Sequence, residues 1–205
     1  MPPGFRVMGQ SVRVWLSMTL AFLSWVAQCA KATPLGAVAK FAASGKPLPK
    51  KDLGRIAMTY GGVYVAQVAM GQNDLQTIRA FIEADAFDGP AIIIAYSHCI
   101  AHGIDMINGL RQQKLAVDSG HWPLFRYNPL LKEQGLNPLQ LDSKKPSIPL
   151  KDYIYTEVRY KMLTHSNPEA AAMLLIQGQK FVDERWAMYE NLAAAKGNPV
   201  PAAAV

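Results

Sequence analysis

The 205 residues are enough for one domain with a hydrophobic core, since half of them are hydrophobic. The formal net charge of +6 favours acidic partners, but no basic tract carries interleaved aromatic residues, which argues against nucleic-acid binding. Two cysteines, Cys29 and Cys99, are too few for a disulfide scaffold, and no Cys/His spacing closes a metal site within the chain.

The first 28 residues resemble a secretory leader. Arg6 and Arg13 precede an apolar stretch at residues 14–27, and small residues follow this stretch. The apolar stretch is too short for a membrane-spanning helix, so the sequence does not predict a membrane protein.

Residues 63–70 and 91–96 predict two buried strands joined by a helix. The second strand is continuously apolar and follows Gly89-Pro90, which is typical of a parallel strand covered on both faces. Between the strands, Asn73 is expected to cap a helix, with Gln76 completing a capping box. A strand, a helix and a strand in this order predict a parallel pair. The apolar face of the helix comprises Leu75, Ile78, Ile82 and Ala86.

Further helices and one strand are expected on either side of this unit. Gly61 and Gly120 are expected to end two of the helices. Asn167 caps a last helix that has Pro168 at its first position. The buried stripe of this last helix comprises Leu174, Phe181, Met188 and Leu192. The other expected elements are a helical turn at 37–43, helices at 50–60, 104–119 and 151–164, and a short edge strand with a turn at 125–129.

Cys99 lies in the loop after the second strand of the predicted unit, behind Ser97 and His98. Loops that leave the carboxyl ends of such strands are where open α/β sheets bind ligands. A thiolate there could be a nucleophile, a redox thiol or a metal ligand, and the alternative is a small buried hydrophobic residue. His98 and His102 flank Cys99 and could orient a ligand or titrate near neutral pH, although such histidines more often hydrogen-bond the loop backbone.

Six stretches form a recognisable pattern in chain order: residues 31–43, 58–61, 63–71, 89–103, 125–129 and 141–143. Through them the chain from Gln28 to about Ala194 closely resembles the C-terminal thiamine-diphosphate domain of pyruvate:ferredoxin (or flavodoxin) oxidoreductases. The resemblance implies an α/β fold, a partial thiamine-diphosphate-binding fold with a mostly parallel sheet flanked by helices and a C-terminal helical pair. We therefore expect a non-matching segment at 1–28, the domain at 29–196 and a disordered tail at 197–205.

The resemblance also implies an activity and a role for Cys99. Enzymes of this family decarboxylate pyruvate, pass the acetyl group to coenzyme A and send electrons through [4Fe-4S] clusters to ferredoxin or flavodoxin. In the family, the cluster nearest the thiamine takes its fourth cysteine from a YS-x-C-I motif, and Cys99 stands at that position here. A cytoplasmic homodimer is implied as well.

The chain departs from the family pattern before Lys31. There the family has a Gly-Asp-Gly turn and an acidic, Asn- and Gly-rich motif that bind magnesium and diphosphate, whereas residues 17–28 contain no Asp, Glu, Asn or Gly. This indicates a truncated gene whose first residues come from another reading frame or an alternative start. If so, another frame of the encoding DNA should yield Gly-Gly-Gln ending at the junction.

Two functions follow from these observations. The chain is either a C-terminal fragment of the oxidoreductase, inactive without the rest of that enzyme, or a non-catalytic orphan α/β binding or structural domain. In both cases we expect the chain alone to bind neither thiamine diphosphate, Mg²⁺ nor a [4Fe-4S] cluster.

Overall fold

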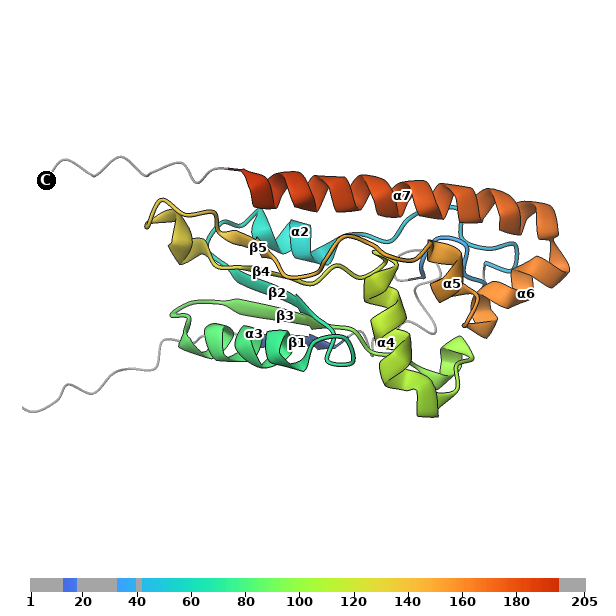
Figure 1. Cartoon of the computed structure of the whole chain (residues 1–205), viewed down its shortest axis with the longest axis horizontal. Helices are drawn as coiled ribbons and strands as arrows, with labels where there is room; N and C mark the ends of the chain where they lie inside the picture. Colours follow the sequence, from blue (N-terminus) through green and yellow to red (C-terminus); the bar gives the residue numbers. More distant parts are fainter. Residues whose placement is uncertain (1–12, 18–32, 40–41, 196–205) are drawn as a thin grey trace, which may run out of the picture.

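A mixed five-stranded sheet forms the centre of the protein (Figure 1). The computed structural model describes residues 13–17, 33–39 and 42–195, and for 13–17 only the backbone. The strand order is β1 (Arg13–Ser17), β3 (Ala91–Ala95), β2 (Tyr64–Val68), β4 (Phe125–Tyr127) and β5 (Leu139–Leu141). The first three strands are parallel, and β4 and β5 pair antiparallel. The predicted α/β class is confirmed, but β4 lies between two strands and not at an edge.

The predicted strand-helix-strand unit is present as β2, α3 (Asp74–Ala86) and β3. Asn73 caps α3, since its side-chain oxygen accepts a hydrogen bond from the Gln76 backbone N–H at 2.9 Å. The capping box is only half formed. The Gln76 side chain turns instead to the sheet, where its Nε2 donates to the Gln67 carbonyl and to Asp142.

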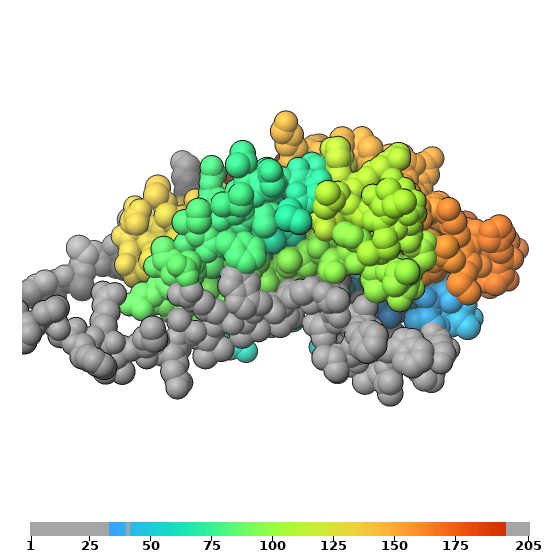
Figure 2. Space-filling model, turned by 90° about the horizontal axis from the view of Figure 1, so that it is seen from below, coloured from blue at the N-terminus to red at the C-terminus, as the bar shows by residue number. Residues whose placement is uncertain are grey.

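The buried face of α3 is not the predicted one. Ala80 and Ala84 lie against β2 and β3, where small side chains let the helix approach the sheet closely. The larger apolar residues face outward, and α3 forms part of the surface beside α4 (Figure 2). The expected face, Leu75, Ile78, Ile82 and Ala86, is exposed.

Four shorter helices differ in extent from the predicted ones. They are α2 (Leu53–Met58), α4 (Gly109–Asp118), α5 (Leu150–Ile154) and α6 (Val158–Ser166). The predicted helix at 104–119 starts later, because the chain first forms the 3₁₀ turns η2 (Ile100–His102) and η3 (Met106–Asn108). The predicted helix at 151–164 is broken before Val158, where the fully buried Glu157 has extended backbone. The described part of 37–43 forms a turn and a bridge, not a helix.

The last helix, α7 (Pro168–Ala194), runs along one side of the molecule and packs on α5, α6 and β5 (Figure 1). The predicted cap is confirmed, since Asn167 accepts from the Ala170 N–H at 3.0 Å and Pro168 occupies the first turn. The buried positions lie beside the predicted stripe: Ala171, Gly178, Val182, Trp186 and Tyr189. With α6, this helix forms the expected C-terminal helical pair.

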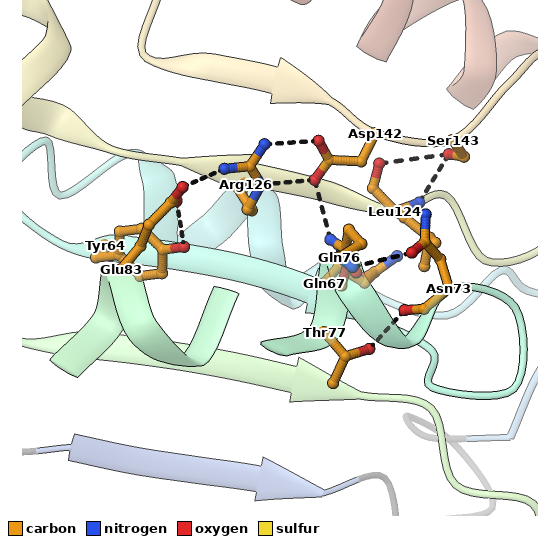
Figure 3. Close-up of polar contacts among 10 residues, drawn as sticks. All are labelled: Tyr64, Gln67, Asn73, Gln76, Thr77, Glu83, Leu124, Arg126, Asp142 and Ser143. Carbon is orange, nitrogen blue, oxygen red and sulfur yellow. Dashed lines mark hydrogen bonds and ion pairs between the residues drawn. The ribbon is translucent and has the colours of Figure 1, made fainter. Parts of the chain in front are cut away.

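A largely buried ionic cluster joins β4 to α3 (Figure 3). Arg126 donates from Nε and Nη2 to the two carboxylate oxygens of Asp142, at 2.8 and 2.9 Å, and also pairs with Glu83. Because alternate residues of a strand face opposite sides, Phe125 and Tyr127 pack into the hydrophobic core on the other face. The sheet is therefore covered on both faces.

Most of the expected N-terminal and C-terminal segments lie outside the described residues. Of residues 1–28 the structure describes β1, which pairs with β3 from Arg13↔Ala91 to Ser17↔Ala95. The expected tail at 197–205 is not among the described residues. Within the described part of the chain, no helix is long and apolar enough to cross a membrane.

Candidate functional site

Cys99 lies in the loop that leaves the carboxyl end of β3, as predicted. It is half-buried, belongs to neither hydrophobic core and forms no disulfide. It is the N-cap residue of η2, and its carbonyl accepts from the His102 N–H at 3.0 Å. The sulfur is thus carried on a loop at the carboxyl end of β3 and not sealed inside the protein.

Gln113 on α4 holds this loop against the neighbouring one. Its Nε2 donates to the Tyr96 carbonyl at 3.4 Å and lies 3.3 Å from Nδ1 of His98. Its Oε1 accepts from the Gly71 N–H at 2.7 Å. One buried amide therefore joins the loops that follow β2 and β3.

A cavity of about 420 Å³ lies beside the same loop. Ser97, Ala101 and His102 of the loop line it, together with Gln67 and Ile94 from the carboxyl ends of β2 and β3. Cys99 and His98 are not among its described lining residues. Of the three residues that the sequence placed together, His102 is the one that lines the cavity, and its backbone N–H still donates to the Cys99 carbonyl.

Basic side chains predominate among the charged groups of the cavity wall. Among the described lining residues, the bases are Lys50, Lys51, Arg159 and Arg185, and the acid is Asp52. Arg159 pairs with the buried Glu157 behind the wall. Arg185 donates from Nη2 to two backbone carbonyl groups, at 3.0 and 2.6 Å.

The positive charge and the burial act together on the titratable groups. Burial, followed by the charges of Arg159 and Lys50, lowers the pKa of His102 to about 3. Burial, followed by the charges of Arg185 and Arg159, lowers the pKa of His121 well below its usual value. Burial, followed by the two arginines, lowers the pKa of Lys50 to about 8. Both histidines are therefore neutral at physiological pH.

A chain of hydroxyl groups leads from the cavity to Glu157. The Tyr96 and Tyr153 hydroxyl oxygens are 2.8 Å apart, and the Tyr153 hydroxyl donates to Glu157 Oε1 at 3.2 Å. Gln112 donates to the same oxygen at 2.9 Å. This buried network fixes the carboxylate that holds Arg159.

Sequence reasoning missed the basic side chains of the cavity. Lys50, Arg159 and Arg185 come from three distant parts of the chain, before α2, on α6 and on α7. No motif connects them, and each is an ordinary basic residue in a predicted helix. Local periodicity did not predict the helix break before Val158, which places Glu157 in the interior beside Arg159.

The described residues do not complete a metal site. No group of three or more His, Cys, Asp or Glu among them could hold a metal ion. A [4Fe-4S] cluster takes four cysteine thiolates, and Cys99 is the one cysteine among the described residues. Magnesium needs several oxygen ligands in octahedral geometry. The described part of the chain therefore does not fit either group without ligands from elsewhere.

The chain is similar to curated pyruvate-flavodoxin oxidoreductases. Those of Nostoc sp. and Trichormus variabilis are 58% and 55% identical to it over 91% of this chain. The pyruvate:ferredoxin oxidoreductase of Moorella thermoacetica is 46% identical over 90% of this chain. In each case the match spans only 16% of the relative. No protein-family model matches the chain. The match to the Nostoc enzyme covers 186 residues, which is longer than the expected domain at 29–196. The expected boundary after residue 28 stays a prediction.

Proposed function

Because this chain is homologous to a segment of the pyruvate-flavodoxin oxidoreductases, we propose that it forms the C-terminal part of such an enzyme. In this proposal the complete enzyme decarboxylates pyruvate, forms acetyl-coenzyme A and passes the two electrons through iron-sulfur clusters to flavodoxin or ferredoxin. Cys99 ligates one iron of a [4Fe-4S] cluster, and the other thiolates come from the rest of the enzyme.

The position of the Cys99 thiol is the observation that carries this proposal. It is half-buried and unpaired on a loop at the carboxyl end of β3, and Gln113 fixes that loop. A sulfur sealed in the core could not reach an iron held by another polypeptide segment. A partly exposed sulfur on a fixed loop can, and its burial would help to set the cluster potential.

In the same proposal the isolated chain is inactive. Residues 17–28 lack the carboxylate and glycine groups that magnesium and diphosphate require. The partners are the remainder of the oxidoreductase, a second copy of the enzyme, coenzyme A, and flavodoxin or ferredoxin, all in the cytoplasm. The net charge of +6 favours such acidic partners.

A complementation experiment tests the role of Cys99. The Nostoc enzyme is produced without only the part that corresponds to residues 29–196, so that it keeps its own magnesium and diphosphate motif. It is mixed with the 205-residue chain and reconstituted with iron and sulfide. We expect the wild-type chain and the control Cys29→Ser to restore cluster content and pyruvate-dependent flavodoxin reduction. Cys99→Ser should restore neither the full iron content nor the flavodoxin reduction, because one cluster is missing. A Cys99→Ser chain that restores the full iron content would refute the assignment.

A non-catalytic α/β domain is the second candidate. It is favoured by two hydrophobic cores and an ionic cluster that form from the described residues of this chain. This candidate predicts a cooperative unfolding transition that thiamine diphosphate, Mg²⁺ and iron leave unchanged, and no complementation of the shortened Nostoc enzyme. Complementation by the wild-type chain would exclude it.

A further inference from the structure

We propose that the cavity beside the β3 loop binds a small organic anion, a carboxylate or a phosphate monoester that carries an apolar group. This site goes beyond the proposed function, since it is built from the cavity walls and does not include Cys99. Its volume of about 420 Å³ suits a small molecule, since ligand pockets measure roughly 300 to 1,000 Å³.

The charge of the wall selects an anion. Arg159 is matched by Glu157, and Asp52 offsets one further positive charge. Both carboxylate oxygens of Asp52 already accept a hydrogen bond, one from the Arg55 N–H and one from the Tyr189 hydroxyl. The wall keeps a net positive charge in a partly dehydrated space, where a bound anion gains more than it would in water.

Two of the side chains that line the cavity also carry a buried nitrogen without a hydrogen-bond partner. Among the described residues, Arg185 Nε and His102 Nδ1 are buried and make no hydrogen bond. Arginine nitrogens can only donate, and a buried donor without an acceptor costs free energy. Arg185 therefore keeps a donor that the described residues do not satisfy.

The rest of the wall selects the apolar part of the ligand. Leu35, Val38, Trp122 and Phe181 line the cavity together with the basic residues. Pockets of this kind bind a ligand body by apolar contact and orient it through a few polar groups. An anion that carries an aryl or short acyl group fits this wall, because the anion meets the basic residues and the apolar group meets the apolar ones.

Titration calorimetry of the full chain tests the proposal with matched probes. Benzoate and phenyl phosphate are the anions, and benzamide is the neutral counterpart of benzoate. We expect one or both anions to bind and benzamide to bind at least about tenfold more weakly, as expected when one charged hydrogen bond is lost. Comparing the two anions identifies the preferred headgroup.

Two variants locate the site. Arg185→Gln and Lys50→Gln should each weaken anion binding about tenfold, whereas Lys180→Gln, an exposed lysine on the same helix as Arg185, should not. Arg185 also donates to two backbone carbonyl groups, so its replacement can destabilise the fold. Urea unfolding is therefore measured for each variant. If Arg185→Gln is unfolded, the result for Lys50→Gln decides the test. Equal binding of benzoate and benzamide, no binding of either anion, or full affinity in Lys50→Gln would overturn the proposal.

Discussion

Two glycines let the Cys99 loop lie close to its neighbouring helices: Gly103 in the loop faces α6, and Gly109 on α4 faces His98 of the loop. A Cβ at Gly103 would be 2.3 Å from Cβ of Val158 on α6, and a Cβ at Gly109 would be 2.1 Å from Nε2 of His98. Gly103 also has a φ of +71°, which side-chain-bearing residues rarely adopt. The two contacts keep the loop close to α4 and α6, and so fix the position of the sulfur.

We predict that Gly103→Ala is strongly destabilising. The new methyl group combines left-handed backbone strain with a collision against Val158, and together these cost about 2 to 4 kcal/mol. Gly61→Ala is the matched control, since Gly61 has a φ of +77° with nothing within 4 Å of its Cβ position. That control should cost only about 1 kcal/mol in urea unfolding. If both variants lost the same free energy of unfolding, Gly103 would not be in close contact with Val158.

The neutral His121 makes stability depend on pH. Its pKa in the folded chain is well below 6.5, so below pH 6.5 the unfolded chain takes up a proton that the folded chain does not. Stability is therefore complete above pH 6.5 and falls as the pH decreases. His121→Asn should remove about 1.4 kcal/mol of the loss measured at about pH 5.5. His102 acts in the same direction, so the variant flattens the profile only in part.

His165→Asn, the same substitution at an exposed histidine, is the control for the change of residue itself. Urea unfolding at several pH values measures all three proteins, and an unchanged slope in His121→Asn would contradict the prediction.

At the scale of elements, the break between α5 and α6 decides the geometry of the cavity wall. Glu157 is fully buried there and accepts from Tyr153, Gln112 and Arg159. A continuous helix over 151–164 fits the apolar periodicity but would not bring this carboxylate to its partners. The tertiary hydrogen bonds outweigh the local preference for helix.

We predict that Glu157→Gln costs about 3 kcal/mol, because it leaves the charge of Arg159 buried without its counter-ion. Glu184→Gln is the matched control. Its ion pair with Lys180 is exposed, with the charged atoms 3.8 Å apart, and should contribute less than about 1 kcal/mol. Urea unfolding compares the two variants, and similar costs would show that the buried network is not important for stability.

At the scale of the whole molecule, the chain spans 16% of the length of the Nostoc relative. It exposes a row of apolar side chains on α3. Ile78 and Ile82 are 54% and 63% exposed. Contiguous exposed apolar residues favour association with other chains. The opposite side of α3 is fixed to the sheet by Ala80 and Ala84 and by the ionic cluster around Arg126.

We predict that Ile78→Glu raises the solubility of the isolated chain without weakening its fold. The substitution adds charge to an exposed position, so the free energy of unfolding should change by less than about 0.5 kcal/mol. Ala80→Glu is the contrasting variant, since Ala80 is 0% exposed and a buried charge there should unfold the chain. Light scattering and urea unfolding measure both. A soluble, folded Ala80→Glu chain would show that α3 does not pack as described.

Local sequence determined the elements whose signals are carried by neighbouring residues. The β2–α3–β3 unit, the caps at Asn73 and Asn167, and the place of Cys99 after β3 were all predicted, because periodicity and capping act over a few residues. The similarity of the chain to the oxidoreductases also follows from sequence alone.

Only the tertiary structure decided which faces are buried and which charges meet. α3 turns its small residues to the sheet because packing distance, and not hydrophobicity, selects the face that fits. Lys50, Arg159 and Arg185 share one cavity although they are far apart in the chain, and the buried Glu157 interrupts a helix to reach its partners. These outcomes depend on contacts between distant segments, which local periodicity does not encode.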